Sequence, residues 1–226
     1  ISEYNKRLSS MNRASRTTLF DDNAKTKCTH ALSEREKRVL HTDVDKAAAL
    51  LRPYRRLRRI PWKFAFVKQS CDIENSYPHT HANTIFLPSM YFSLPTDRRV
   101  RLLIHEKVHI YQRYNPIPYN KIILQHFGYA VHGYCPSHPD FYRVRANPDT
   151  NDIIYSLDKN YVLPLLNSRA SRLSDVRIQQ YVAGSQSITD HSHGDFTSEH
   201  PNEVLAYYLE HVIPLNSVPT QWRGLL

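Results

Sequence analysis

Hydrophobic residues recur every three or four positions in three stretches of the chain, as they do along one buried face of a helix. The first stretch follows Ser33 and Glu36, which form the S-x-x-E pattern of a capping box. The second runs from about 96 to 113, and the third starts at Pro201, a residue type favoured in the first helical turn. A fourth helix is predicted near 119–131.

Runs of alternating or β-branched residues predict short strands between these helices. They lie at 62–67, 83–87, 153–157, 161–163 and 176–182. We expect a loop at 69–82, and the short connection Asp158-Lys159-Asn160 predicts a hairpin. Helices and strands in this order predict an α+β fold with a small, twisted, mixed sheet.

Length and composition indicate one folded domain with a basic arm. The chain has 226 residues, of which 41% are hydrophobic, enough to form a single core. Residues 1–32 are polar, basic and without periodicity, so we predict an N-terminal arm or tail there and a folded domain over 33–226. The net charge of +9 favours an acidic partner, such as nucleic acid, an anionic membrane surface or an acidic assembly.

The cysteines Cys28, Cys71 and Cys135 are far apart in the sequence and form no C-x-x-C motif. An odd, sparse set is poor material for a disulfide framework, which favours a reducing environment, inside a cell or within an assembled particle. No apolar run approaches the roughly 18 residues that a membrane span needs. The chain begins with Ile1 rather than Met, so a leader sequence stays an open alternative.

The second predicted helix contains the motif with the clearest chemical meaning, His105-Glu106-Lys107-Val108-His109, which matches H-E-x-x-H. Two histidines four positions apart lie one above the other on a helix and can bind one metal ion. The carboxylate of Glu106 can then act as a general base toward a water molecule. The alternatives are a buried helix with incidental histidines and a metal site without activity.

A catalytic zinc ion generally has three protein ligands and one open position, so a third ligand is required. The longer H-E-x-x-H-x-x-G-x-x-H pattern is absent, because Gln112 and Asn115 occupy the positions of its glycine and last histidine. A glutamate from a later helix is the other common solution. Glu203 fits it, in an N-E-x-x-A run at the start of the last predicted helix, and Glu199 and His200 are rival ligands.

With these two motifs the chain resembles the gluzincin type of zincin metallopeptidases, whose thermolysin-like members combine H-E-x-x-H with a downstream N-E-x-x-S-D helix. The resemblance implies Zn²⁺ as cofactor, the two motif histidines and Glu203 as its ligands, and Glu106 as general base. It also implies a zincin-like fold in which a C-terminal helix supplies the third ligand. The chain departs from the pattern at Ala206 and Tyr207, which replace Ser-Asp, so a carboxylate that orients one histidine is expected to be missing.

Other residues are candidates for substrate contacts because of their positions relative to the motif. In the zincin plan the strand just before the active-site helix, here 83–87, runs along the cleft and pairs with an extended peptide. Tyr207, His211 and His193 are candidates for contacts to the substrate or the transition state. Core packing and helix capping are the alternative roles of the first two.

Residues 52–59 include five arginines, and Arg55, Arg56, Arg58 and Arg59 are candidate contacts to nucleic acid or phosphate. A solvated helix end is the alternative. We interpret the chain as a zinc-dependent metallopeptidase that hydrolyses peptide bonds of a protein substrate. The alternative is a non-catalytic, basic subunit of a virion or ribonucleoprotein with the zincin fold as scaffold, and a peptidase acting on nucleic-acid-bound proteins would combine the two.

Overall fold

The computed structural model describes residues 28–71, 74, 77–145, 147–166, 176–182, 188–190 and 200–226. Most of the predicted arm lies outside this part of the chain, as do the candidate contact His193 and the rival ligand Glu199. Residues 28–32, which we assigned to the arm, are joined to the fold, since the N–H group of His30 donates to the carbonyl oxygen of Phe66 at 3.0 Å. The folded part therefore begins before residue 33.

The predicted helices are all present in the described part of the chain. Its α-helices are α4 (Glu34–Leu50), α5 (Arg55–Arg59), α6 (Thr96–Tyr114), α7 (Pro116–His126) and α8 (Pro201–Val212). The capping box forms as predicted, with the N–H group of Ser33 donating to Glu36 Oε2 at 2.8 Å. Helix α7 begins earlier than predicted, because Pro116 is well suited to the first helical turn. It also ends earlier, at His126, and residues 130 and 131, which we predicted as helix, lie in strand β4 (Ala130–Tyr134). None of these helices is both long and apolar enough to cross a lipid bilayer.

Three strands form a small mixed sheet before α6. Strand β3 (Thr84–Pro88) lies in the middle, parallel to β1 (Phe64–Val67) and antiparallel to β2 (His79–His81). The predicted loop at 69–82 therefore contains a strand that the sequence pattern did not indicate. The prediction that 83–87 is the strand beside the substrate is wrong in one respect, because β3 is paired on both sides and its backbone cannot accept a further strand.

The remaining strands form two separate antiparallel sheets. In one, β4 (Ala130–Tyr134) pairs with β5 (Ile153–Ser156); in the other the order is β6 (Asn160–Leu166), β7 (Val176–Val182) and β8 (Ile188–Asp190). The predicted hairpin forms only its turn, in which Leu157 and Asn160 exchange hydrogen bonds of 2.8 Å and Asp158 and Lys159 have positive φ. Beyond the turn the two strands diverge into different sheets, so the predicted hairpin pairing is wrong. The short 3₁₀ helices are Gln69–Cys71, Ser89–Ser93, Cys135–Ser137, Phe141–Arg143 and Thr220–Trp222.

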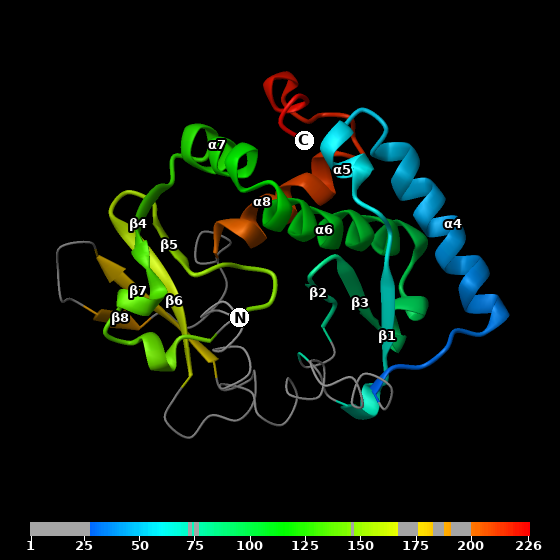
Figure 1. The fold of residues 1–226 in the computed structure, drawn as a ribbon, viewed down its shortest axis with the longest axis horizontal. Helices are drawn as coiled ribbons and strands as arrows, with labels where there is room; N and C mark the ends of the chain where they lie inside the picture. Colours follow the sequence, from blue (N-terminus) through cyan, green and yellow to red (C-terminus); the bar gives the residue numbers. More distant parts are fainter. Residues whose placement is uncertain are drawn as a thin grey trace.

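Helix α6 lies at the centre of the molecule (Figure 1). Every residue from 103 to 112 is buried, because α4, α5, α7, α8 and the β1-β3-β2 sheet all pack around this helix. Even Lys107 is 1% exposed; its Nζ atom lies 3.5 Å from the ring centroid of Trp62 and donates to the carbonyl oxygen of Ile60 at 2.6 Å. The expected α+β class is confirmed, with small mixed and antiparallel sheets around a central helix.

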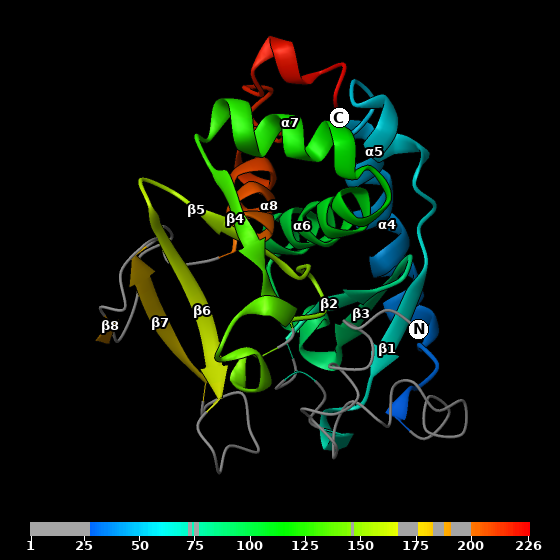
Figure 2. The same ribbon diagram turned by 60° about the vertical axis from the view of Figure 1, so that its left-hand side comes forward.

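The strands β4 to β8 form a lobe beside α6, best seen in Figure 2. This lobe has a small core of its own, made by Cys135, Val144, Ile154, Leu163, Leu165 and Tyr181. The main core lies around α6 and includes side chains from α4, α5, α7, α8 and the chain end. The space between the lobe and α6 is where a cleft can form.

Cys28 and Cys71 form a disulfide, with their Cα atoms 5.7 Å apart. The inference that three scattered cysteines would not pair is therefore wrong for these two, and Cys135 is the buried free cysteine. The sequence argument failed because spacing along the chain says little about distance in space: the disulfide ties the segment before α4 to the 3₁₀ turn after β1. The preference for a reducing environment loses its support.

Candidate metal centre

His105, His109 and Glu203 come together between two packed helices. His105 and His109 lie one turn apart on α6, and Glu203 lies in the first turn of α8. Their nearest ligand atoms are mutually close: the two histidine Nε2 atoms are 3.0 Å apart, and each lies 3.4 Å from Glu203 Oε2. The histidines are 7% and 1% exposed. Three residues predicted from two distant motifs thus form one buried cluster.

The spacing within this cluster fits a tetrahedral metal ion. Zinc bonds of about 2.0–2.2 Å at tetrahedral angles separate the ligand atoms by about 3.3–3.6 Å. The carboxylate-to-imidazole distances of 3.4 Å match that range, and the imidazole pair at 3.0 Å is slightly tighter. Two imidazoles and one carboxylate are also the donor set of gluzincin-type zinc sites. The residues present therefore fit the group that the sequence implied.

Glu210 orients His105. It lies on α8 two turns after Glu203, and its Oε2 atom is 2.9 Å from His105 Nδ1. An Nδ1–H group that donates to this carboxylate leaves Nε2 with a free lone pair directed at the cluster. The expectation that an orienting carboxylate is missing is therefore wrong. The group comes from a position seven residues after Glu203, and not from the Ser-Asp position occupied by Ala206 and Tyr207.

His109 is oriented by Gln112, the residue that occupies the glycine position of the longer H-E-x-x-H-x-x-G-x-x-H pattern. The Nδ1 atom of His109 lies 3.0 Å from Gln112 Oε1, and Gln112 Nε2 donates to the backbone carbonyl of Asn202 at 2.8 Å. A side-chain amide placed in this way accepts from the histidine and donates to the start of α8. The same residue therefore holds the second histidine and joins the two helices.

Asn202 fixes the start of α8 next to the cluster. This residue is 4% exposed; its side chain donates to the carbonyl oxygen of Asp149 at 2.9 Å and accepts from the hydroxyl group of Tyr119. Asn147, from the same loop as Asp149, donates to Glu203 Oε1 at 3.0 Å. The loop before β5 thus holds Glu203 directly through one residue and its helix through another.

Charges within the cluster balance the cost of burial. Burial alone opposes ionisation of Glu203, but the adjacent His109 and His105 hold the pKa of its carboxyl well below the usual value. Burial likewise opposes protonation of His105, yet its contacts with Glu203 and Glu210 raise the pKa of its imidazole. A set of buried groups that stabilise each other's charged forms is typical of functional sites.

Glu106 is 2% exposed, and its Oε2 atom is buried without a hydrogen-bond partner in the described structure. Burial, with a further contribution from the charge of Asp149, raises the pKa of Glu106 to about 8. Asp149 itself accepts hydrogen bonds from the N–H and hydroxyl groups of Thr80 at 2.8 and 2.6 Å. A buried carboxyl oxygen without a partner is costly unless another group, such as a water molecule, binds there.

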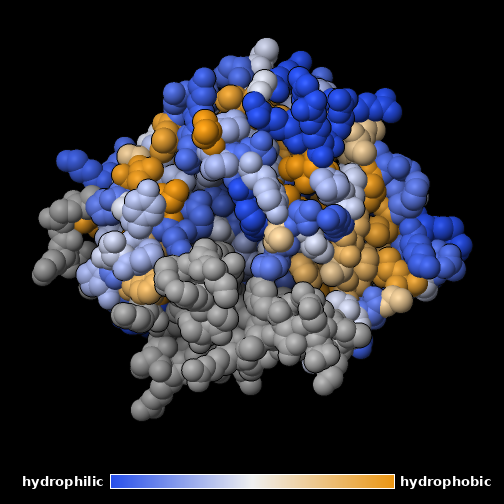
Figure 3. Space-filling model, in the orientation of Figure 1, coloured by the Kyte–Doolittle hydropathy of each residue, from blue (hydrophilic) through white to orange (hydrophobic). Residues whose placement is uncertain are grey.

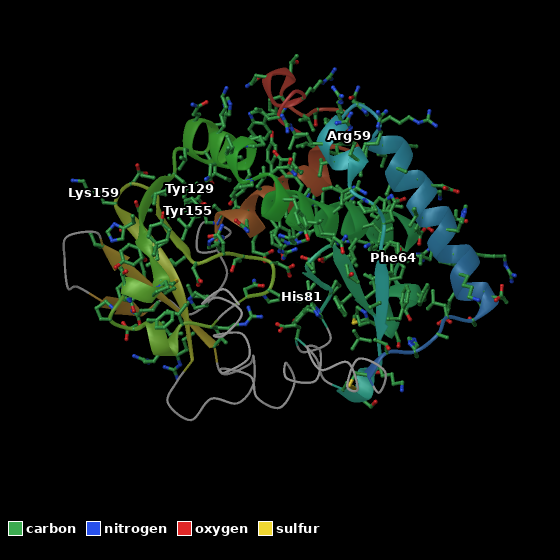
Figure 4. All side chains as sticks on the ribbon, in the orientation of Figure 1. Arg59, Phe64, His81, Tyr129, Tyr155 and Lys159 are labelled. Atoms are coloured by element: carbon green, nitrogen blue, oxygen red, sulfur yellow. A yellow bond between two sulfur atoms is a disulfide. The ribbon has the colours of Figure 1, made fainter. Side chains whose placement is uncertain are left out.

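The cluster lies on the wall of a cavity of about 1120 Å³ between α6, α8 and the lobe. His105, Glu106, His109, Glu203 and Glu210 all line it. The lobe contributes mainly aromatic and aliphatic side chains, among them Tyr129, Tyr155, Ile154, Tyr161, Leu163 and Ile178. Figure 4 shows Tyr129 and Tyr155 on the lobe, across the molecule from Phe64 of β1. The cavity is large enough for several residues of an extended peptide.

The edge strand nearest the cavity is β2, and its free side is partly occupied. The N–H group of Thr80 points away from β3 to Asp149, and the preceding Pro78 has no N–H group. Donors for a substrate strand are therefore scarce along this edge. We predicted that a substrate strand would pair with the strand before α6. The central strand β3 cannot accept such a strand, and the edge strand β2 offers few free donors for it.

The other candidate residues lie at different distances from the cluster. The ring of Tyr207 packs edge-on against His105 with centroids 4.7 Å apart, and this residue lines the cavity. The side chain of His211 is 54% exposed, lies 2.7 Å from the carbonyl of Tyr207 and is not part of the cavity wall. His200 caps α8: its Nδ1 atom accepts from the N–H group of Asn202 at 3.1 Å, so it is not part of the His105 cluster.

The four candidate arginines for nucleic acid, Arg55, Arg56, Arg58 and Arg59, are exposed on α5 and do not line the cavity. In Figure 4, Arg59 lies on the opposite side of α6 from His81 of β2. The metal cluster and the arginine cluster are therefore separate features of the molecule.

Sequence reasoning missed Glu210, Gln112, Asn202 and Asn147. Glu210 was within reach of the argument, because positions i and i+7 of a helix lie on the same face as one another and Glu203 was already assigned. Gln112 similarly lies three positions after His109 on the same face. Asn147 carries no such signal, because it lies in a loop whose path only the folded structure reveals.

Replacing Glu210 by Gln is expected to weaken zinc binding by about 10–100-fold, because the amide no longer holds the Nδ1–H group of His105 as a carboxylate does. The dissociation constant can be measured by competition with a chromogenic zinc chelator. The control is Glu34→Gln, at a glutamate on α4 whose side chain is 77% exposed. Unchanged affinity in the Glu210 variant would contradict the orienting role.

His200 is expected to make the metal-free protein sensitive to acid. Burial lowers its folded-state pKa to about 4, below the unfolded value of about 6.5. The unfolded chain therefore binds this proton first, and stability present above pH 6.5 is lost as the pH falls toward 4. Between pH 7 and 5 the wild type should lose about 2 kcal/mol more unfolding free energy than His200→Ser, which keeps a capping side chain.

Urea unfolding with a chelator present at both pH values measures this difference. His211→Ser, at the half-exposed histidine of the same helix, is the control and should keep the wild-type loss. Equal losses in the wild type and in His200→Ser would show that the buried histidine does not control the acid response.

Comparison with known proteins adds no family to this description, because no family model, no curated protein and no solved structure matches the chain. What the geometry itself establishes is a buried His-His-Glu cluster able to hold a metal ion, within an α+β fold. The function has to be inferred from the chemistry of that cluster and its cavity.

Proposed function

We propose that this chain is a zinc-dependent peptidase, with His105, His109 and Glu203 as metal ligands and Glu106 as general base. The observation that carries the proposal is the convergence of the three ligand atoms at tetrahedral spacing, next to a buried carboxyl group on the wall of a large cavity. A structural zinc site usually closes with four protein ligands, whereas three ligands beside a cavity leave one position open.

Zinc bound there would supply a Lewis acid that polarises a substrate carbonyl and makes water a better nucleophile. The oxygen of the water adds to the carbonyl carbon while a proton passes from the water to a carboxylate oxygen of Glu106. Glu106 then gives the proton to the amide nitrogen as the carbon–nitrogen bond breaks, which regenerates its carboxylate. The carboxyl group of Glu106 can make both transfers because it is a base when ionised and an acid once it has taken the proton.

Tyr207 is our candidate for stabilising the negative charge that develops on the carbonyl oxygen. Its ring is packed against His105, and it lines the same cavity. A hydroxyl group there can donate a hydrogen bond to an oxyanion. His211 is less suitable because its side chain is turned to the surface, and His193 remains a candidate from the sequence alone.

The role of Glu106 is tested by Glu106→Gln, which should bind about one equivalent of zinc like the wild type but cleave an unfolded protein substrate at least about 100-fold more slowly, the usual contribution of a general base. Glu203→Gln should lose both zinc and cleavage, because a ligand is removed. Zinc content can be measured by elemental analysis and cleavage by mass spectrometry of casein digests. Full activity in the Glu106 variant would refute the mechanism.

We also propose that the α5 arginines bind nucleic acid, a contact that the alternative role as a non-catalytic subunit of a virion or ribonucleoprotein would use. Five arginines at 52–59 are exposed, and among the described residues no ion pair engages them. Figure 3 shows a strongly hydrophilic surface over α5, away from the lobe. Phosphate groups are suitable partners for a cluster of guanidinium groups without carboxylates of their own. A peptidase held on nucleic acid would act on the proteins bound beside it.

Neutralising the four α5 arginines as Arg55→Gln, Arg56→Gln, Arg58→Gln and Arg59→Gln should weaken binding to single-stranded DNA and RNA. It should also make the slope of log K against log salt less steep by about 3 to 4, because each phosphate contact contributes roughly 0.7–0.9 to the magnitude of that slope. Fluorescence anisotropy with labelled oligonucleotides measures both. Arg35→Gln and Arg38→Gln on α4 form the control. If the wild type binds no nucleic acid, these arginines are surface charges that only keep the protein soluble.

A further inference from the structure

Two further arginines lie on the face of α6 that carries the metal cluster. Arg98, Arg101, His105 and His109 are spaced by three or four positions, and all four line the same cavity. Arg101 is half-buried and Arg98 is exposed nearer the start of the helix. The stripe therefore places two guanidinium groups one and two turns before the first metal ligand.

These two arginines differ from the buried and half-buried arginines Arg145, Arg99 and Arg113 around α6 in having no partner among the described residues. Arg145, the third arginine of the cavity wall, pairs with Glu74 at 2.6 Å. Arg99 pairs with Asp43 at 2.6 Å, and Arg113 donates to carbonyl and hydroxyl oxygens around Thr80. For Arg98 and Arg101, no hydrogen bond or ion pair is found within the described part of the chain.

Four carboxylates of the cavity wall, those of Glu74, Asp149, Glu203 and Glu210, are already engaged by other groups, and within the described part of the chain neither Glu106 nor Asp158 forms an ion pair with Arg98 or Arg101. Glu210 is bound to His105, Glu203 lies within the cluster, and Asp149 accepts two hydrogen bonds from Thr80. Partial burial strengthens the attraction of an unpaired guanidinium group for an anion, because less water screens it. A carboxylate matches the planar donor fork of an arginine, and it is the anionic group that peptides carry at the C-terminus and in acidic side chains.

We propose that Arg101, assisted by Arg98, binds a carboxylate of the peptide substrate close to the bond that is cleaved. The proposal rests on the peptidase function and names the substrate class of that site. Four residues of helix span about 6 Å, and an extended peptide about 3.3 Å per residue, so the carboxylate falls within about three residues of the cleaved bond. Its source is an acidic side chain or the free C-terminus of the substrate.

The probe is a set of fluorescent decapeptides in which one glutamate is moved through the positions and compared with glutamine. Each peptide is made with a free C-terminal carboxylate and with an amide. Cleavage sites and kcat/KM are measured by mass spectrometry with wild-type, zinc-loaded protein. Binding is measured in parallel by fluorescence anisotropy with Glu106→Gln, so that affinity is obtained whether or not cleavage occurs.

We expect a preference of roughly tenfold for the peptide with the matching carboxylate, the size of one charge-assisted hydrogen bond. Arg101→Gln should remove the preference by slowing cleavage of the matching glutamate peptide more than cleavage of the amidated glutamine peptide, and Arg101→Glu should transfer the preference to a lysine peptide. Arg98→Gln should reduce the preference in part. Arg35→Gln, an exposed arginine on α4, is the matched control and should behave as wild type.

The outcomes separate the two proposals. A preference that follows the glutamate in amidated peptides identifies an acidic side chain, whereas one that requires the free terminus identifies a C-terminal carboxylate. Arginine-dependent binding without any cleavage would refute the peptidase and support the carboxylate site. Cleavage without a carboxylate preference, or an Arg101→Gln variant that slows acidic and neutral peptides equally, would overturn the carboxylate site alone.

Discussion

The contact between α6 and α8 encloses five ionisable side chains, and the rest of the structure depends on how their burial is balanced. Isolated charges cost several kcal/mol each when they are removed from water, so such a group must be paired or hydrogen-bonded. Here His105 and His109 face Glu203, Glu210 holds one imidazole, and Gln112 holds the other. Within this group of side chains, only Glu106 keeps a buried oxygen without a hydrogen-bond partner, and this residue lines the cavity.

The same helix also buries a charge on its far side, by a different means. Lys107 stands between the two motif histidines in sequence, yet its ammonium group lies over Trp62 and donates to Ile60. Burial lowers the pKa of this lysine to about 7. Because successive residues of a helix point in different directions, the cluster is not exposed to this amine. The motif therefore serves two environments, the cleft through its histidines and glutamate and the packed core through its lysine.

How much of this could be predicted depends on whether the signal was local. Helices α6 and α4 and the start of α8 could be predicted from hydrophobic periodicity and from residues that favour helix starts, such as the capping box of α4. The three cluster residues could also be predicted, because the H-E-x-x-H motif gives the two histidines and the start of α8 gives Glu203. The disulfide, strand β2 and the separation of β5 from β6 depend on contacts between distant segments. Short strands such as His79–His81 carry too few residues to show an alternation, and the pairing of Cys28 with Cys71 depends on the path of the chain in space.

The position of Glu210 on α8 helps to fix the cluster between the two helices. Glu203 and Glu210, the carboxylate that orients His105, share one helix, and the two histidines share the other, so two rigid elements define the cluster. The lobe of β4 to β8 forms the opposite cavity wall but contributes none of the three cluster residues. Its connection to the cluster runs through the loop before β5, where Asn147 binds Glu203 and Asp149 lies near Glu106. A change in the lobe therefore alters the shape of the cavity first, and it can reach the cluster residues through that loop or through β5, where the carbonyl oxygen of Ile153 lies 3.2 Å from Nε2 of the α8 cap His200.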